Sequence, residues 1–453
     1  MVFLWKKSVD THQEIVHNNC IDLLYNNLLK SITVLLVVSF NYIFYFDYTI
    51  DSTAYTSYNI RKENKVLIKN GTIVKLDCVE RGDIRIIDGK IAAIGKNLSA
   101  QVGEEVIFAN GAYVTAGFVD IHTHGGYGAD FMDCTKEAFE TALSFHLDNG
   151  TTTVVPTSCT APKQEIIDFL RFSKTYIEKQ NKKGAHVVGV HLEGPYLSVK
   201  NRGAQKLEEL AEPAKDDYSY MLEFADTIKT VTISPELCGA EEMTKALTEN
   251  GILVSGGHDD GIYPEFLPAI KNGLKHLTHI YCAMSELRFK DGVRNVGLRE
   301  YALIDDNLTA EMIADNKHVT QELAKMIIRA KGSDKVCVVS DSLRCAGMPN
   351  DGKLYKLGSG ETAQLVRVND GVATLADGSR FAGSITSVRQ MVKNLIDAGI
   401  PLCDAVKMGT YTPSKIIGEE NHIGSIEIGK DADVCILDDN FEIVKVVLKG
   451  VLT

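Results

Sequence analysis

The sequence has 453 residues, 45% of them hydrophobic, so it is long enough to bury the core of at least one large domain. Its formal net charge of -12 and pI near 5.5 argue against nucleic acid or an anionic membrane as the main partner. The 10 cysteines include no C-x-x-C pair, which favours reduced thiols and a cytoplasmic location.

Residues 1–63 differ in composition from the rest of the chain. They are rich in Asn, Tyr, Ile and Leu and contain Trp5, the single tryptophan of the sequence. Residues 31–46 form an apolar run that is shorter than the roughly 20 residues of a membrane-spanning helix. A membrane anchor and a signal peptide stay as alternatives, although no small-x-small cleavage site follows the run. We expect an appended extension that the catalytic fold does not need.

Short β segments begin near Lys65 and are separated by Asn-Gly and Asp-Gly dipeptides. Such dipeptides between alternating apolar residues are a strong signal of β-hairpins. The far C-terminal part of the chain has the same character. We therefore predict a small β-sandwich domain that residues 64–113 and 420–453 form together.

Residues 114–419 alternate strand-like apolar runs with helical patterns, which predicts parallel βα units. Eight such strand-like runs occur, the number that a closed barrel requires. The predicted fold is therefore of the α/β class, a TIM-like (β/α)8 barrel with the β-sandwich domain attached. An insert at residues 354–377 has hairpin character and could form a flap beside the barrel mouth.

Polar side chains end six of these runs: His122 and His124, Glu193, His258, His279, Asp315 and Asp341. Active sites of this architecture lie at the carboxyl ends of the strands, so we expect these side chains to converge. The two histidines of the first run are two residues apart and project to the same face of their strand. Three further histidines are expected to be hydrogen-bonded core residues, namely His146, His186 and His276.

A carboxylate with several imidazoles suits a zinc or iron(II) ion, because these metals take nitrogen and oxygen ligands and retain an open position for water. Glu193, His258 and His279 are the best candidates for binding the principal divalent ion. Asp341 is a candidate general acid and base, since a carboxylate beside such an ion can take a proton and return it to a leaving nitrogen. Metal ligation and helix capping stay as alternatives for Asp341.

Several motifs occur in an order and spacing that span nearly the whole barrel. They are Gly117–Gly125 (GFVDIHTHG), Gly189–Tyr196 (GVHLEGPY), Ser255–His258 (SGGH), Leu277–Tyr281 (LTHIY), Ile313–His318 (IADNKH), Val339–Asp341 (VSD) and Phe381–Ser384 (FAGS). On these motifs the chain resembles the amidohydrolase superfamily and, within it, the N-acetylglucosamine-6-phosphate deacetylases.

The resemblance implies that Glu193, His258 and His279 hold the main metal and that Asp341 is the acid/base residue. Relatives that keep the His-x-His pair can hold a second ion there, with the glutamate bridging. The resemblance therefore implies one or two zinc or iron ions in this chain. Other amidohydrolases use a carboxylated lysine as the bridge, but a glutamate occupies that strand end here.

The substrate implied by the resemblance is N-acetyl-D-glucosamine 6-phosphate, which would be hydrolysed to glucosamine 6-phosphate and acetate. The residues expected to contact this amino-sugar phosphate are Ala204, Gln205, Cys282, Ala283, His318, Phe381, Ala382 and Gly383. Candidates for binding the phosphate are Arg202, Arg288, Lys290 and Arg294. A homodimer is also expected, in which a neighbouring subunit could supply such a group.

Two departures from the family pattern concern the substrate. Gln205 stands where relatives place a histidine after Gly-Ala, and Cys282 replaces the asparagine of Asn-Ala-Met. An amide cannot carry the charge of an imidazolium. Deacetylation of another N-acyl sugar phosphate, such as N-acetylgalactosamine 6-phosphate, therefore stays an alternative. A non-enzymatic reading also stays an alternative, namely a catalytically silent barrel that acts as an assembly module.

Overall fold

The structure is a computed structural model that describes residues 64–180, 184–360 and 363–453. The predictions made for residues 1–63 lie outside the described residues. Within the described ranges, every helix is too short or too polar to cross a membrane.

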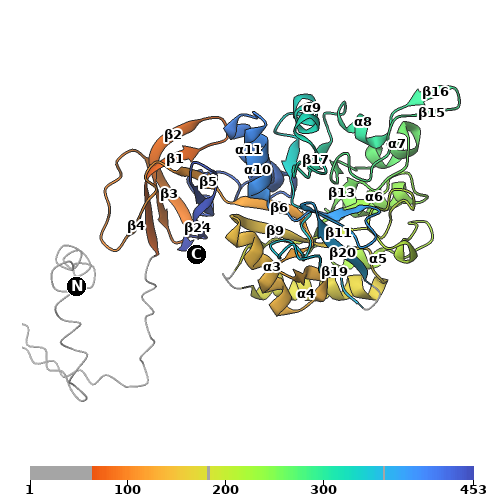
Figure 1. The fold of residues 1–453 in the computed structure, drawn as a ribbon, viewed down its shortest axis with the longest axis horizontal. Helices are drawn as coiled ribbons and strands as arrows, with labels where there is room; N and C mark the ends of the chain where they lie inside the picture. The colour runs from red at the N-terminus through yellow and green to blue at the C-terminus, as the bar shows by residue number, and fades with distance from the viewer. Residues whose placement is uncertain (1–63, 181–183, 361–362) are drawn as a thin grey trace, which may run out of the picture. The chain divides into compact units, whose positions relative to one another are not determined.

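Eight strands from the two ends of the chain form one hydrogen-bonded sheet. They are β1 (Lys65–Val74), β2 (Val79–Ile87), β3 (Lys90–Gly95), β4 (Glu105–Phe108), β5 (Tyr113–Ala116), β23 (Val434–Leu437), β24 (Ile443–Leu448) and β25 (Val451–Leu452). The antiparallel pairing of β5 with β23 joins the strands of the two parts of the sequence, and Figure 1 shows β24 beside the strands β1–β5. The arrangement of this sheet as a two-layered sandwich, and the domain boundaries, stay predictions.

The turn between β2 and β3 shows how the sequence builds these hairpins. Asp88 and Gly89 have φ angles of 48° and 80°, the left-handed conformation that Asp-Gly adopts in two-residue hairpin turns. On the strands beside the turn, Ile84, Ile86 and Ile91 are buried in a core that belongs to this sheet. Alternation of apolar and polar residues therefore fixes which face of each strand is covered.

Eight parallel strands form the barrel, each hydrogen-bonded to the next in the chain order. They are β6 (Phe118–Thr123), β9 (Thr151–Ser158), β11 (Val190–Glu193), β12 (Ile228–Ile233), β13 (Leu253–Gly256), β14 (His276–Leu277), β17 (Thr309–Met312) and β18 (Val336–Val338). Beyond the end of β18, the Asp341 N–H donates to the His122 carbonyl oxygen at 2.9 Å and brings the last strand to the first. The predicted α/β fold with a nearly closed eight-stranded barrel is confirmed.

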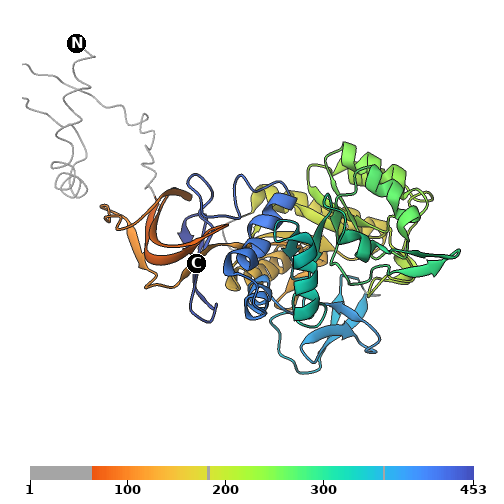
Figure 2. The ribbon, with the colours of Figure 1, turned by 90° about the horizontal axis from the view of Figure 1, so that it is seen from above.

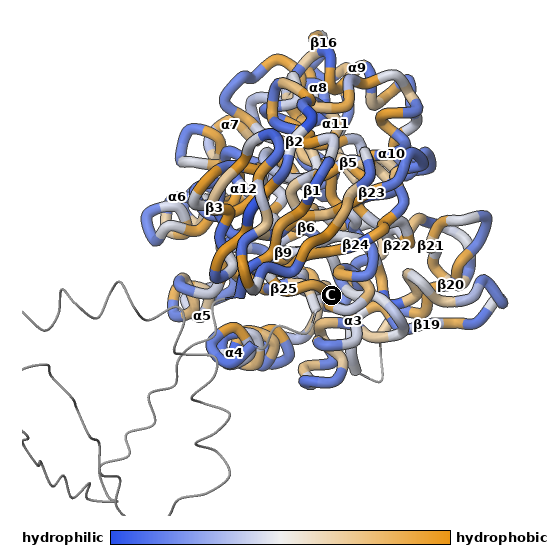
Figure 3. Tube along the Cα trace, turned by 90° about the vertical axis from the view of Figure 1, so that its left-hand side faces the viewer, coloured by the Kyte–Doolittle hydropathy of each residue, from blue (hydrophilic) through white to orange (hydrophobic). Residues whose placement is uncertain are grey.

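Helices cover the outside of the barrel (Figure 2). They are α3 (Lys136–Asp148), α4 (Lys163–Lys179), α5 (Ser219–Glu223), α6 (Ala240–Glu249), α7 (Tyr263–Lys271), α8 (Leu298–Ala302), α9 (Gln321–Lys331), α10 (Val388–Asp397), α11 (Leu402–Gly409) and α12 (Tyr411–Ile416). In α10 the buried residues Val388, Met391, Val392 and Leu395 recur at helical spacing and form one apolar face. Figure 3 shows apolar residues gathered along the strands, with polar residues in the loops at the edge.

The insert after β18 is a four-stranded antiparallel sheet. Its strands are β19 (Leu354–Leu357), β20 (Gln364–Asn369), β21 (Val372–Leu375) and β22 (Phe381–Gly383). An isolated bridge between Ser342 and Ser384 ties the end of this sheet to the barrel. The remaining short strands are β7 (Gly125–Gly126), β8 (Ala129–Asp130), β10 (His186–Val187), β15 (Arg288–Lys290) and β16 (Val293–Asn295). The hairpin character predicted for the insert is confirmed.

Candidate metal centre and active site

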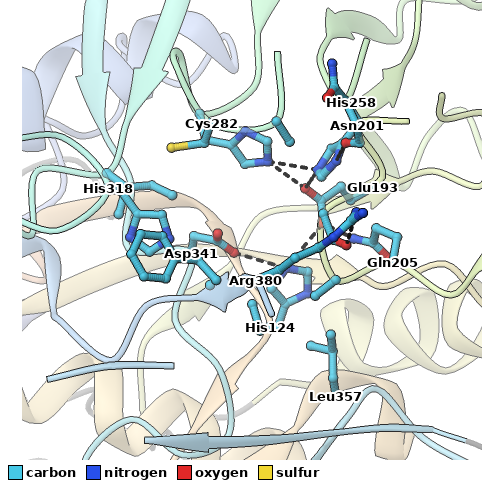
Figure 4. A pocket seen from close by; sticks show the side chains of 18 of the residues that line it. His124, Glu193, Asn201, Gln205, His258, Cys282, His318, Asp341, Leu357 and Arg380 are labelled. Atoms are coloured by element: carbon cyan, nitrogen blue, oxygen red, sulfur yellow. Dashed lines mark hydrogen bonds and ion pairs between the residues drawn. The ribbon is translucent and has the colours of Figure 1, made fainter. Parts of the chain in front are cut away.

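Three side chains at the ends of β11, β13 and β14 point their ligand atoms at one another in a cavity (Figure 4). The Nε2 atoms of His258 and His279 each lie 3.0 Å from Glu193 Oε1 and 3.1 Å from each other. Ligands of a tetrahedral zinc ion stand about 3.3 Å apart, as follows from metal–ligand distances near 2.0–2.1 Å. These three atoms therefore fit a divalent metal ion.

The His-x-His pair of β6 forms a second group around the same glutamate. His122 Nε2 lies 3.5 Å from Glu193 Oε1, and His124 Nε2 lies 3.5 Å from Glu193 Oε2. His122 Nε2 is buried without a hydrogen-bond partner among the described residues. A buried polar atom of this kind needs a partner, and a metal ion between the two imidazoles and the carboxylate would supply it.

Hydrogen bonds at the opposite ring nitrogens hold three of these imidazoles in place. His122 Nδ1 donates to Glu311 Oε2 at 2.8 Å, while His258 Nδ1 donates to the Asn201 carbonyl oxygen at 2.9 Å. His124 Nδ1 lies 3.2 Å from the Thr157 carbonyl oxygen. In a neutral imidazole that donates from one ring nitrogen, the other nitrogen carries no proton and can bind a metal ion, and here that second nitrogen faces the site.

Charges inside the site favour a bound cation. Burial alone raises the pKa of the Glu193 carboxyl, but attraction to His122 and hydrogen bonds from the surrounding imidazoles hold this pKa well below its ordinary value. Burial likewise lowers the pKa of His122, but the carboxylates of Glu311, Glu193 and Asp341 raise it well above its ordinary value. The buried acidic groups thus stabilise positive charge at this place.

Three of the converging residues have an unusual backbone. His258, His279 and Asp341 have φ angles of 49°, 30° and 46°, in the left-handed region that side chains other than glycine seldom adopt. Such conformations cost about 1–3 kcal/mol each and cluster at functional sites, where the surrounding structure holds them. Each occurs just after a barrel strand ends, where the chain turns its side chain into the cavity.

Asp341 lies beside the two histidines of β6 and its end. Its Oδ1 atom is 3.2 Å from His124 Nε2 and 3.6 Å from His122 Nε2. The Asp341 carbonyl oxygen accepts a hydrogen bond from the N–H of Ser384, the first residue after β22, at 2.8 Å. This bond fixes the Asp341 backbone against the insert. A carboxylate in this position suits either proton transfer or ligation.

All eight predicted substrate-contacting residues line the cavity: Ala204, Gln205, Cys282, Ala283, His318, Phe381, Ala382 and Gly383. The His318 and Phe381 rings lie 4.9 Å apart and form one wall. Asp315 does not line the cavity, although it was expected to converge there. Its Oδ2 atom instead lies 2.8 Å from His318 Nδ1 and orients that ring.

Gln205 also lines the cavity, but both of its polar atoms are bonded to the protein. Its Nε2 donates to Glu193 Oε2 at 2.6 Å, and its Oε1 accepts from the Thr160 N–H at 2.8 Å. The side chain is buried. The sequence predicted a substrate contact, whereas this geometry relates Gln205 first to the shared carboxylate.

The cationic residues of the cavity differ from those expected. Among the described residues, the cavity lining contains none of the predicted phosphate-binding residues Arg202, Arg288, Lys290 and Arg294. It contains Lys200 and Arg380. The Lys200 ammonium is paired with Asp260 at 2.8 Å. Arg380 donates from Nη1 to the Gly203 carbonyl oxygen at 3.2 Å and has no carboxylate partner in the described ranges.

The three histidines predicted to be hydrogen-bonded core residues all have polar partners, but only His146 and His276 are buried. His146 is buried and contacts Thr123 Oγ1 at 2.9 Å, and His276 is buried and contacts Thr309 Oγ1 at 2.7 Å. His186 is half-buried and accepts a hydrogen bond from Lys449 Nζ at 3.1 Å. Sequence reasoning missed Glu311, although a glutamate inside the apolar run of β17 was a signal of a buried polar partner.

Residues 113–453 match the amidohydrolase family, so the chain belongs to that family. Members of this family depend on a metal, and the described residues hold two groups that can bind one. Within the family, the chain is similar to N-acetylglucosamine-6-phosphate deacetylases. It is 31% identical to that of Bacillus subtilis over 391 residues, which is 85% of this chain and 96% of the relative.

Two further comparisons agree with this placement. The crystal structure of the N-acetylglucosamine-6-phosphate deacetylase from Pasteurella multocida has a TM-score of 0.79 and 28% identity, covering 86% of this chain and 99% of that one. The N-acetylgalactosamine-6-phosphate deacetylase of Escherichia coli O157:H7 is 29% identical over 371 residues, 82% of this chain and 94% of the relative.

Proposed function

We propose that this chain is a metal-dependent deacetylase of amino-sugar catabolism that hydrolyses N-acetyl-D-glucosamine 6-phosphate to glucosamine 6-phosphate and acetate. The observation that carries the proposal is that Glu193 faces four imidazoles beside Asp341, at the carboxyl ends of barrel strands. This arrangement occurs in a chain similar to named deacetylases along most of its length.

In this proposal, Glu193, His258 and His279 hold the principal ion, which is zinc or iron(II). His122 and His124 hold a second ion with the shared glutamate. Such an ion, when bound, lowers the pKa of water and polarises a carbonyl oxygen. Asp341 then accepts the proton of the attacking water and delivers it to the amine nitrogen as the amide C–N bond breaks.

Arg380 is the group that we propose for the phosphate of the substrate. A guanidinium can give two parallel hydrogen bonds to a phosphate, which is a geometry that suits planar recognition of that anion. Arg380 lines the cavity and has no carboxylate partner in the described ranges, whereas Lys200 is already paired with Asp260. A substrate with two negative charges needs such a local cation, because the whole chain carries a net charge of -12.

N-acetylgalactosamine 6-phosphate is the second candidate substrate. It differs from the first only in the orientation of one hydroxyl group, and one of the similar proteins carries the name of a deacetylase for it. The altered residue Cys282 lies at the cavity and is a position at which selectivity can differ.

Acetate release from metal-loaded protein distinguishes these candidates. The substrates to compare are the 6-phosphates of N-acetylglucosamine, N-acetylgalactosamine and N-acetylmannosamine, together with the three unphosphorylated sugars. We expect the highest kcat/KM for N-acetylglucosamine 6-phosphate. A higher kcat/KM for N-acetylgalactosamine 6-phosphate would make that sugar phosphate the preferred substrate instead. Absence of acetate from all six compounds would favour a catalytically silent barrel.

We also propose a cytoplasmic homodimer. The cysteines in the described ranges are all free thiols, in agreement with a reducing compartment. The dimer rests on the family resemblance, and light scattering of the purified protein measures it directly. A mass close to the 49.7 kDa of one chain would contradict the dimer.

A further inference from the structure

We propose that Gln205 is a positioning residue that orients the Glu193 carboxylate so that its Oε1 faces His258 and His279 while its Oε2 faces His124. This inference goes beyond the proposed function, but it rests on the metal-binding roles given there. It assigns to the residue that departs from the family pattern a task at the metal centre rather than at the substrate.

The two contacts of Gln205 fix the orientation of its amide group. A backbone N–H can only donate, so Thr160 must face the amide oxygen, at 2.8 Å. An ionised carboxylate can only accept, so Glu193 must face the amide nitrogen, at 2.6 Å. Because the amide is buried and both partners lie in the barrel, its position is determined from two sides.

The two oxygen atoms of Glu193 consequently have different surroundings. Oε1 lies 3.0 Å from the Nε2 atoms of both His258 and His279 and 3.5 Å from His122 Nε2. Oε2 receives the Gln205 hydrogen bond and lies 3.5 Å from His124 Nε2. Rotation of the carboxylate would exchange these surroundings, and the Gln205 bond opposes that rotation. The amide therefore keeps Oε2 directed to His124.

The charge of the amide matters as much as its position. An imidazolium at this place would form an ion pair with Glu193 and offset part of the negative charge that attracts a divalent ion. A glutamine gives the same kind of hydrogen bond and stays neutral at every pH. In this chain, the carboxylate thus keeps its full charge for the metal ions.

Metal binding by the full-length protein tests this proposal without any substrate. The metal-free wild type, Gln205→Leu and Gln205→Met would be titrated with Zn²⁺ in competition with a chelator, and bound metal would be counted by elemental analysis. We expect two ions per chain in the wild type. Loss of a partner that orients a metal ligand typically weakens metal affinity by about 10- to 100-fold. Both variants should show a loss of this size for the more weakly held ion.

Gln364→Leu is the matched control. Gln364 Nε2 donates to the Ala204 carbonyl oxygen at 2.6 Å, so it anchors the same loop from the insert without touching a metal ligand. We expect this variant to bind Zn²⁺ as tightly as the wild type. An equal loss in Gln364→Leu and Gln205→Leu would overturn the proposal, because loosening of the loop would then explain both.

Two other outcomes would also overturn it. One is a wild type that binds a single ion, and the other is wild-type affinity for both ions in either Gln205 variant. Gln205→Met keeps the length of the side chain and stays neutral but cannot donate to Glu193, so it tests the hydrogen bond even where the leucine variant fails to fold. A wild type that binds two ions but releases no acetate would refute the proposed function and leave this inference standing.

Discussion

Glu193 is the residue on which the proposed chemistry depends most, because both groups of potential metal ligands include its carboxylate. It ends β11 and is buried among the imidazoles of three other strands. One glutamate thus brings together side chains that the sequence separates widely. The remaining chemistry at the residue scale concerns proton transfer by Asp341 and recognition of the anionic end of the substrate.

Replacing Arg380 by glutamine tests recognition of the phosphate. A hydrogen bond to a charged group contributes about 1.5–3 kcal/mol, so we expect kcat/KM for N-acetylglucosamine 6-phosphate to fall about 10- to 100-fold. Slow hydrolysis of unphosphorylated N-acetylglucosamine should not change. Arg367→Gln, in β20 of the same insert and outside the cavity lining, is the control. Equal losses on both sugars would instead place Arg380 at the reacting carbonyl.

Glu236 gives a prediction about pH and stability. Burial, reinforced by repulsion from Asp259, raises its pKa from 4.5 to about 8. The folded state therefore holds a proton that the unfolded state releases, and stability falls as the pH rises from 4.5 towards 8. Glu236→Gln removes this charge, so it should raise Tm at pH 8 and change it little at pH 5.

The matched control is Glu249→Gln, which removes an exposed carboxylate from the end of α6. Its effect on Tm should not grow with pH. Thermal unfolding of the wild type and both variants from pH 5 to pH 8 measures the difference. A Tm change in Glu236→Gln that is the same at every pH would contradict the assigned pKa.

At the scale of elements, β22 connects the insert to the residue proposed for proton transfer. Gly383 has a φ of 121°, and a Cβ atom added there would lie 2.8 Å from the Asp341 carbonyl oxygen. The next residue donates its N–H to that same oxygen. The end of β22 therefore allows no side chain, and its close approach sets the backbone position of Asp341.

Gly383→Ala should consequently displace Asp341. A catalytic group misplaced by about 1 Å can cost about 100-fold in rate, so we expect a fall in kcat of that order with little change in bound metal. Gly378→Ala is the control, because Gly378 also has a positive φ, of 74°, but no atom of the described residues lies within 4 Å of the added atom. If both variants lose the same activity, backbone strain and not the contact with Asp341 is responsible.

At the scale of the whole molecule, the elements were predictable where periodicity decides them. Each of the eight strand-like runs became a barrel strand, because alternation with helices leaves a parallel sheet few other arrangements. The converging histidines and carboxylates were predictable for the same reason, since parallel strands end on one side. Glycine and aspartate turns likewise predicted the hairpins of the smaller sheet and of the insert.

Contacts between distant loops could not be predicted in this way. Arg380 meets the carbonyl of Gly203, a residue 177 positions earlier, and no periodic pattern relates the two. Gln205 lies 45 positions from Thr160, and the Thr160 N–H sets the orientation of the Gln205 side-chain amide. Asp315 ends its run as the other site residues do, yet local hydrogen bonds direct it to His318. Such details depend on how loops pack once the barrel has formed.

A shortened protein that begins at Asn64 should fold and keep its activity. The regular β pattern starts near Lys65, and the family match spans residues 113–453. We expect the Tm of the shortened protein to agree with that of the full chain within experimental error. Its kcat/KM should lie within about twofold of the full-chain value, because changes outside the packed structure have small effects. Insolubility, or a clear loss of Tm, would show that residues 1–63 contribute to the fold.

The most direct measurement of the central claim is the stoichiometry of products formed from N-acetylglucosamine 6-phosphate by metal-loaded protein, compared with Asp341→Asn. The wild type should release acetate and glucosamine 6-phosphate in equal amounts. The variant should keep its metal but turn over about 10²- to 10⁴-fold more slowly, as expected for loss of a general acid and base. Absence of acetate from the fully metal-loaded wild type, or near-normal turnover by the metal-loaded variant, would contradict the account.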